Sequence, residues 1–485
     1  MFEFELPEKF RRYVPLVVWA LVALVVLLIP LKITGLGYLP ADDALRHVAK
    51  AVSGKPWPEI LVLGDAFKLD HNLGWHAFLG AIHRATNWGT EDLVVFSVIL
   101  LFVIANGAML PWLRRPEAWL VALLTAMIIS DVPQRLMLGR PFILTITVLM
   151  TVLFAAQKCR PDWRMFALFT VALAACTFVH GVWYLWVLPI AAFFFAGQFR
   201  WTILLALAWI VGVACAALLT GHPMDYLSQA VDMAAGSVGQ HATNRTEVTE
   251  LQPFGGDILA VITVGALVGL RLLTKPAVPL TRNPAFWIMC GCWILGFRVS
   301  RFWEDWGWPA LMVWIATEVE FLLVARFAAD SLRRLLLALI LALATFLAVT
   351  CDLNSRWTGS LTWQFLSTAD HPELAGWMPE KGGILYSADM NVFYQTFFKN
   401  PNADWRYMVG YEPALMPPED FKTYYKILWN DGDLKAYAPW VAKMKPADRL
   451  VIHGTSAGRP NIPQLEWNYG VSGLWIGRIP RTSPK

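Results

Sequence analysis

Residues 11–31 read RRYVPLVVWALVALVVLLIPL, and this stretch decides the class of fold. Two arginines precede an apolar run that ends at Leu31, close to the roughly 20 residues that a helix needs to cross a bilayer. A secretory signal begins in the same way, but no small-residue cleavage site clearly follows this run. We therefore expect a transmembrane anchor whose N-terminal end is cytoplasmic.

The rest of the chain is also strongly apolar. Hydrophobic residues make up 57% of the 485 residues and charged residues 16%, with a mean hydropathy of +0.48. Soluble globular domains carry about 25% charged residues. Further apolar runs lie at residues 93–112, 118–130, 142–156, 165–180, 182–197, 201–220, 257–274, 284–298, 308–325 and 335–351. We expect a polytopic α-helical membrane protein with about 11 transmembrane helices.

Basic residues occur in every second connection between these runs, from Lys9 to Arg334. This alternation follows the positive-inside rule and places the N-terminus in the cytoplasm. An odd number of spans then places the C-terminal residues on the opposite side of the membrane. The net charge of only +4 and the short basic clusters argue against nucleic acid as a partner.

The composition changes after Cys351, where polar residues, proline and glycine interrupt every apolar run. We expect residues 1–352 to form the membrane domain and residues 353–485 to form a soluble α/β domain. Short strands are predicted at residues 383–387, 449–453 and 473–479, and a helix at 418–429. None of the six cysteines lies beyond Cys351, so no disulfide framework is expected.

A first outer loop over residues 36–90 opens with the acidic sequence Ala41-Asp-Asp-Ala-Leu-Arg-His47. Asp42 precedes Arg46 by four residues and Asp43 precedes His47 by four, so opposite charges stack along a helix. Adjacent helical residues point about 100° apart, and the two aspartates therefore cannot both aim at one atom. One is a candidate base, the other a cap or structural partner. Alternatively, Asp42 only caps the helix and Asp43 only pairs with Arg46 or His47.

A second amphipathic helix is predicted over residues 72–86 of this loop. Trp75 and Phe78 share one side of it, whereas His76 and His83 lie on the other. We expect this helix to lie on the membrane surface. The two histidines are about 10 Å apart along the axis, too far to bind one metal ion, so a packed or hydrogen-bonded histidine is expected and no metal site is predicted.

Three further polar groups lie at the outer ends of predicted spans. The first group is Gln134, Arg135 and Arg140, and the second is His180 alone. The third group is Arg298, Arg301, Glu304 and Asp305. Arginine at membrane depth is costly unless it meets an anion, which makes these residues candidates for binding a lipid phosphate. Interfacial snorkelling is the alternative explanation.

This arrangement resembles the GT-C superfamily of membrane glycosyltransferases, which includes the protein O-mannosyltransferases and the lipid A aminoarabinose transferase. The resemblance covers the first span and its acidic motif, the two amphipathic loop helices around 43–53 and 72–86, about eleven spans, and an outer C-terminal domain. In that domain, Phe397-Phe-Lys-Asn-Pro401 and Gly410-Tyr-Glu-Pro413 are similar to the tails of uncharacterised members.

The resemblance implies which residues act. An aspartate of the motif serves as general base towards an acceptor hydroxyl in the family, which here means Asp42 or Asp43. The Arg135/Arg140 turn and Arg298/Arg301 correspond in placement to residues that hold the lipid phosphate. Arg46, His47, His76 and His180 are further candidate substrate-binding residues. Some members bind a divalent cation, Mg²⁺ or Mn²⁺, through a later acidic motif, for which Asp225, Asp232 and Glu247 are available.

The expected function is that of an inverting glycosyltransferase in a bacterial inner membrane, with the C-terminal domain in the periplasm. It would move a hexosyl or pentosyl group from a polyprenyl-phosphate-linked donor to an extracytoplasmic glycan, lipid or protein. A non-catalytic GT-C-like protein that binds lipid or acts as a scaffold in envelope glycan assembly is the alternative. A transporter or flippase is a third hypothesis, although paired broken spans are missing from the sequence.

Overall fold

The computed structural model describes residues 7–128, 132–238, 252–274, 279–430, 433–454 and 458–480. The chain divides into two compact units. The first, which we call the helical unit, comprises residues 1–38, 96–223 and 248–358. The second, which we call the mixed unit, comprises residues 39–95, 224–247 and 359–485.

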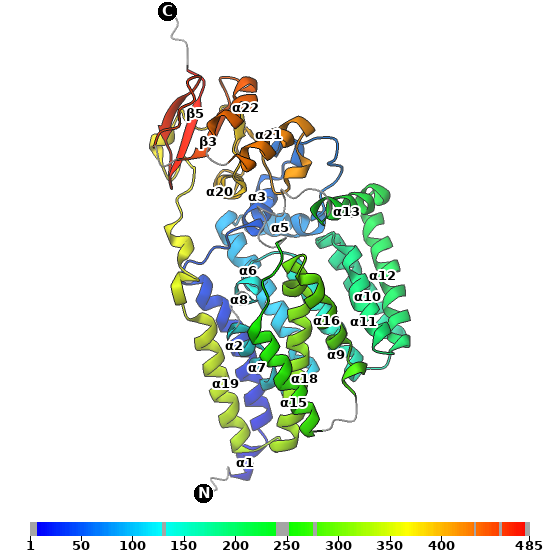
Figure 1. Ribbon diagram of the computed structural model, residues 1–485. Helices are drawn as coiled ribbons and strands as arrows, with labels where there is room; N and C mark the ends of the chain where they lie inside the picture. The colour runs from blue at the N-terminus through cyan, green and yellow to red at the C-terminus, as the bar shows by residue number, and fades with distance from the viewer. Residues whose placement is uncertain are drawn as a thin grey trace, which may run out of the picture. The chain divides into compact units, whose positions relative to one another are not determined.

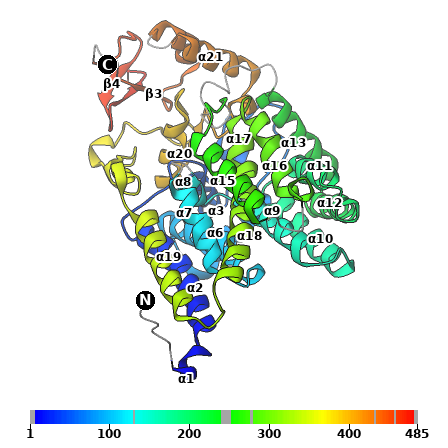
Figure 2. The same ribbon diagram turned by 60° about the horizontal axis from the view of Figure 1, so that its bottom comes forward.

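The helical unit is built from apolar helices that pack lengthwise. Figures 1 and 2 show α2 beside α19 and α10 beside α12. Glycine permits the second of these contacts, because a Cβ on Gly212 would lie 2.8 Å from the carbonyl oxygen of Thr170. The helices are α1 (Glu8–Arg11), α2 (Val14–Thr34), most of α6 (Thr90–Gly107), α7 (Glu117–Ile128), α8 (Val132–Leu136), α9 (Phe142–Lys158), α10 (Trp163–Val179), α11 (Val187–Phe195), α12 (Phe199–Leu219), α15 (Ile258–Thr274), α16 (Pro284–Gly296), α17 (Ser300–Phe302), α18 (Trp308–Arg326) and α19 (Leu332–Thr350).

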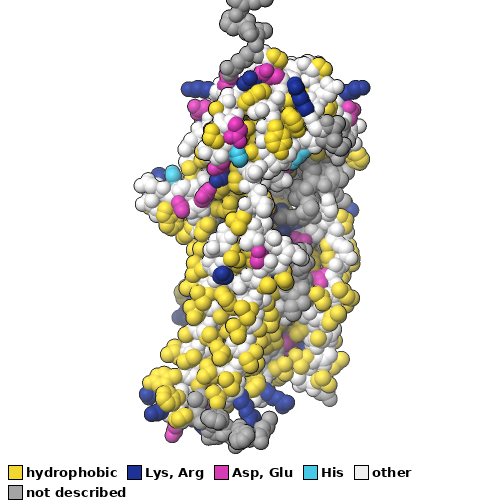
Figure 3. Space-filling view, turned by 90° about the vertical axis from the view of Figure 1, so that its left-hand side faces the viewer, with side chains coloured by type: hydrophobic (Ala, Val, Ile, Leu, Met, Phe, Trp, Pro, Cys, Tyr) yellow, Lys and Arg dark blue, Asp and Glu magenta, His cyan; other side chains and the backbone are white. Residues whose placement is uncertain are grey.

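Five helical segments in the described residues are long and apolar enough to cross a membrane, namely Glu8–Thr34, Thr90–Trp112, Phe199–Leu219, Ser300–Arg326 and Leu332–Thr350. The other predicted runs lie on apolar helices of 10–17 residues. Large hydrophobic side chains are exposed on α2, α12 and α19, among them Leu16, Ile203 and Leu343. Figure 3 shows hydrophobic side chains over wide areas of the face that it draws. These helices indicate a membrane protein, while the count of eleven spans remains a prediction.

The mixed unit contains a five-stranded sheet with the strand order β2-β1-β3-β5-β4. β1 (Ile384–Tyr386) runs parallel to β2 (Arg406–Tyr407) and β3 (Arg449–His453). β5 (Leu474–Arg478) runs antiparallel to β3 and to β4 (Glu466–Tyr469). The predicted strands at β1, β3 and β5 are confirmed, as is the predicted helix at α21 (Pro418–Trp429).

Buried clusters cover both faces of this sheet. Successive strand residues point to opposite faces, so Leu385 joins a different cluster from Tyr386. Leu385 packs in the cluster that contains Phe393 of α20 (Met390–Lys399). Tyr386 packs in the cluster of α21 and α22 (Ala438–Lys443), which contains Trp440.

The first loop belongs to the mixed unit. Its helices are α3 (Asp43–Ser53), α4 (Trp57–Ile60) and α5 (Leu73–Thr86), and α13 (Pro223–Val238) lies almost wholly in this unit. α3 packs against α5 and α20, and the Val62 N–H donates to the Tyr407 carbonyl oxygen at 2.9 Å. Trp57 and Ile60 are buried in the same core as Tyr407.

This grouping differs from the predicted division of the chain at residue 352. The prediction places the loop in the membrane domain because the loop directly follows the first span in the sequence. In the structure, residues 39–95 form one unit with residues 359–485, because the apolar side chains of the loop are buried against the C-terminal core.

Candidate functional site

The two aspartates at the start of α3 have different surroundings. Asp42 occupies the N-cap position, where its carbonyl oxygen accepts from the Leu45 N–H at 2.9 Å and its side chain makes no capping hydrogen bond. Asp43 forms an ion pair with Arg46, in which Arg46 Nε lies 2.7 Å from Asp43 Oδ1. The predicted pairing of Asp43 with a basic residue is therefore confirmed, one turn of helix apart.

Arg46 is held between this carboxylate and an aromatic ring. Its guanidinium carbon lies 4.0 Å from the centre of the Tyr411 ring, which also packs against Trp57 at 4.9 Å. Burial opposes the charge of Arg46, but the charge and hydrogen bond of Asp43, together with Tyr394 and Tyr411, outweigh burial and raise the pKa of the guanidinium. Its Nη1 atom is buried and makes no hydrogen bond to the described residues. The arginine is therefore a fixed cation with unused donor capacity.

His47 and His76 meet inside the mixed unit. His47 Nδ1 lies 2.8 Å from His76 Nε2, and His76 Nδ1 lies 2.6 Å from Asp70 Oδ2. The expectation of a hydrogen-bonded His76 is thus confirmed. His83 does not join them, since its Nδ1 contacts the Trp88 carbonyl oxygen at 2.8 Å.

Burial and local charge set the protonation of these groups. Burial, with the nearby charges of Arg46 and Lys50, lowers the pKa of His76 more than Asp70 raises it. Burial also lowers the pKa of the neighbouring His71, to about 4. Burial opposes ionisation of Asp70, but His76, the Asn72 N–H and Lys50 together lower the pKa of its carboxyl. His71 and His76 are thus neutral near pH 7, beside the ionised Asp70.

Sequence reasoning missed three members of this site, which are Asp70, Tyr411 and Trp57. Asp70 precedes His76 by six residues and lies outside α5, so no helical spacing links the two. Tyr411 lies in the C-terminal part of the chain, and only its place in the quoted motif Gly410-Tyr-Glu-Pro413 singled it out.

In the helical unit, candidates from three separate turns come together. Arg135 Nη1 lies 3.0 Å from Glu304 Oε2, and Arg135 Nε donates to Asp305 Oδ1 at 2.7 Å. Arg301 Nε lies 3.0 Å from Asp305 Oδ2. The Phe142 ring lies 5.3 Å from the Arg135 guanidinium and 6.2 Å from the His180 ring.

A π-helical turn over Trp303–Gly307 positions the two acids of this cluster. Gly307 is needed there, because a Cβ at this position would collide with the Trp303 ring. Two arginines thus meet two carboxylates, so Arg135 already has anionic partners. Arg140 is buried and Arg298 is exposed.

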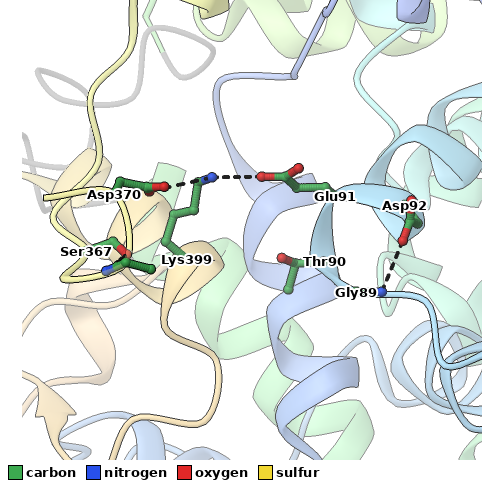
Figure 4. A pocket seen from close by; sticks show the side chains of 8 residues that line it. Gly89, Thr90, Glu91, Asp92, Ser367, Asp370 and Lys399 are labelled. Atoms are coloured by element: carbon green, nitrogen blue, oxygen red, sulfur yellow. Dashed lines mark hydrogen bonds and ion pairs between the residues drawn. The ribbon is translucent and has the colours of Figure 1, made fainter.

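A recess of about 370 Å³ lies elsewhere in the mixed unit (Figure 4). Its lysine is already paired, since Lys399 Nζ lies 2.7 Å from Glu91 Oε1 and 3.6 Å from Asp370 Oδ2. None of its lining residues belongs to the predicted site. They are Gly89, Thr90, Glu91, Asp92, Ser367, Ala369, Asp370 and Lys399.

The acids available for a divalent cation do not form a cluster in the described part of the chain. Asp225 lies 3.4 Å from the ammonium of Lys68, and Asp232 is exposed on α13. Glu247 lies outside the described residues. Within those residues, no group of three or more His, Cys, Asp or Glu side chains is arranged to hold a metal ion.

No protein-family model matches this chain, and a search of curated proteins finds no significant match. Any function must therefore be argued from the residues of the site.

Proposed function

We propose that the protein is an inverting membrane glycosyltransferase of the GT-C type. It transfers a sugar from a polyprenyl-phosphate-linked donor to a hydroxyl group of an extracytoplasmic acceptor. The observation that carries the proposal is the start of α3, where two carboxylates precede a buried arginine that lies 2.7 Å from one of them. Such a site offers both a base and a cation for a phosphate.

The proposed reaction is a single displacement at the anomeric carbon. The acceptor O–H bond breaks and its proton passes to a carboxylate, while the acceptor oxygen forms a bond to the anomeric carbon. The bond between that carbon and the phosphate oxygen breaks, and the phosphate leaves with the electron pair. Attack opposite the leaving phosphate inverts the configuration, and nearby positive charge stabilises the departing group.

The environments of the two aspartates support a division of roles. Asp43 directs one oxygen to Arg46, and its side chain is 25% exposed. We assign Asp43 to holding the arginine and Asp42 to accepting the proton. Arg46 can then donate from Nη1 to a phosphate oxygen, since this atom makes no hydrogen bond to the described residues.

The proposal includes the membrane topology. The N-terminus is cytoplasmic, about eleven helices cross a bacterial inner membrane, and residues 359–485 lie in the periplasm. The alternation of basic connections supports this orientation. It is tested with single cysteines at Lys445 and Arg333 in a background without the native cysteines. A membrane-impermeant maleimide applied to spheroplasts should label K445C but not R333C, and the reverse pattern would overturn the topology.

One observation favours a second candidate, a non-catalytic protein that binds polyprenyl lipid or acts as a scaffold. Arg135 is already paired with Glu304 and Asp305, as a structural ion-pair network would be. The two candidates differ in turnover. The purified protein in detergent should transfer label from at least one member of a panel of radiolabelled polyprenyl-phosphate sugars to membrane extracts. Lipid binding without transfer from any donor would favour the scaffold.

A further inference from the structure

The recess of Figure 4 lies between two distant parts of the chain. One wall is formed by residues 89–92 at the start of α6, and the other by Lys399 of α20 together with residues between 367 and 370. All of them belong to the mixed unit. Figure 4 shows Lys399 reaching from one wall towards Glu91 on the other. The volume of about 370 Å³ is within the range of small-ligand pockets.

Lys399 is a hydrogen-bond donor that is held in place at this recess. Its ammonium lies 2.7 Å from Glu91 Oε1, 3.6 Å from Asp370 Oδ2 and 5.0 Å from the centre of the Phe365 ring. The lysine side chain is only 19% exposed. Because it is already ordered, it loses little further conformational entropy when it donates to a ligand.

Other groups in the two walls have hydrogen-bonding capacity that the described residues do not use. Ser367 is 2% exposed, and its Oγ accepts from the Ala369 N–H at 3.2 Å, but its own O–H donates to none of those residues. Thr90 Oγ1 makes no hydrogen bond within that part of the chain, and neither Glu91 Oε2 nor Asp370 Oδ1 accepts one there. A buried hydroxyl whose hydrogen has no partner in the protein indicates that a ligand or water completes the bond.

The chemistry of the lining selects a neutral ligand that is rich in hydroxyl groups. The acids Glu91, Asp92 and Asp370 outnumber the one basic side chain, Lys399, so the recess repels anions. An ammonium ligand suits the carboxylates, but it has no acceptor for the lysine or for the hydroxyl donors. A sugar hydroxyl both donates and accepts, so it can serve both kinds of group. Apart from one glycine and one alanine, every lining residue is polar, which disfavours a lipid chain.

We propose that this recess binds one or two sugar units of a neutral glycan, and that this glycan is the acceptor of the proposed transfer. The second part of the inference rests on the proposed function, whereas the first part does not. It narrows the acceptor from a glycan, lipid or protein to a glycan. The recess volume lies at the lower end of the range for ligand pockets, which limits the bound part to one or two sugar rings.

Saturation-transfer NMR measures binding to the purified full chain in nanodiscs, which avoid detergents with sugar head groups. The neutral probes are glucose, galactose, mannose, N-acetylglucosamine, lactose, cellobiose and chitobiose. At least one should bind with a Kd below about 10 mM. The uronic acid of a bound hexose should bind at least about 10-fold more weakly than the hexose, and putrescine should not displace the sugar. No binding by any neutral probe, equal binding of the uronic acid, or displacement by putrescine would overturn the inference.

Two substitutions place the bound sugar in the recess. A369W fills the space without changing a charge, and K399M removes the ordered donor; each should weaken sugar binding by at least about 10-fold. A438W is the matched control, because Ala438 is exposed at the start of α22 in the same unit and does not line the recess. Its Kd should stay within about twofold of the wild type. Thermal unfolding verifies that each variant folds, and unchanged binding in a folded A369W or K399M would overturn the site.

Turnover tests whether the bound glycan is the acceptor. With a donor that the wild type uses, A369W should raise the KM for this glycan by about 10-fold or more and leave kcat within about threefold. A438W should match the wild type. An unchanged KM in A369W would contradict the acceptor assignment. Absence of turnover in the wild type would defeat the proposed function, whereas sugar binding that A369W abolishes would still establish the recess as a glycan site.

Discussion

The Arg46 guanidinium lies over the Tyr411 ring, with its central carbon 4.0 Å from the ring centre. The two residues come from opposite ends of the chain but belong to one unit. Because Arg46 is only 5% exposed, this contact is largely desolvated and contributes up to about 2 kcal/mol. Tyr411 thereby holds the arginine that pairs with Asp43.

Replacing Tyr411 tests this contact. Y411F keeps the aromatic face and should lower the free energy of unfolding by less than about 1 kcal/mol, whereas Y411L should lower it by about 2 kcal/mol or more. Thermal unfolding in detergent, followed by tryptophan fluorescence, measures both. Equal destabilisation by the two variants would show that the ring contributes only packing volume.

A buried ion pair between α7 and α19 predicts a large effect in the helical unit. Arg334 Nε lies 2.6 Å from Glu117 Oε1, with side-chain exposures of 3% and 0%. E117Q leaves Arg334 charged and poorly paired, so it should cost about 3–5 kcal/mol. E419Q, in the exposed Lys443–Glu419 pair, should change stability by less than about 1 kcal/mol.

The double variant E117Q/R334M checks the cause of that loss. Removing both charges should recover most of the stability that E117Q loses, because the uncompensated buried cation is then absent. The fraction of protein that stays folded after heating is measured by size-exclusion chromatography for the wild type, E117Q, E419Q and E117Q/R334M. A double variant less stable than E117Q would contradict an electrostatic origin.

The low pKa of His71 predicts a loss of stability on acidification. The unfolded chain protonates this histidine below its ordinary value near pH 6.5, whereas the folded protein does so only at about pH 4. Between these values the unfolded state binds more protons, so stability should fall as the pH falls from about 6.5 to about 4. H71Q should flatten this part of the pH profile of the melting temperature.

His453 provides a control of opposite sign. Its hydrogen bond to Asp389 raises its pKa despite partial burial. This pair therefore stabilises the fold below pH 6.5 and loses that contribution as the pH rises through the raised pKa. H453Q should lower the melting temperature most at acidic pH. A wild-type profile that H71Q leaves unchanged would contradict the assignment to His71.

The apolar helices could be predicted because a helix that crosses lipid needs a continuous hydrophobic run. Helices α2 and α12, for example, cover the predicted apolar runs at residues 14–31 and 201–220 almost completely. Strand β3 (Arg449–His453) was predictable from its apolar centre, Leu450-Val-Ile452, but β2 has two residues and no pattern of its own. The spacing of acidic and basic residues predicted a pair at Asp43, although the i,i+4 pattern favoured His47 over the partner found, Arg46.

The remainder of the site depends on tertiary packing. Asp70 meets His76 only because the turn before α5 folds back onto that helix. Tyr411 meets Arg46 only because the loop and the C-terminal residues share a core. Residue spacing along the sequence therefore predicts neither contact.

The most direct test of the account is the initial rate of sugar transfer by D42N and D43N, compared with the wild type and with D225N. We expect D42N to lose at least about 100-fold in kcat, as removal of a general base does, and D43N to raise KM for the donor because Arg46 loses its partner. D225N should match the wild type. Full activity in both D42N and D43N would contradict the claim that the acidic start of α3 performs the reaction.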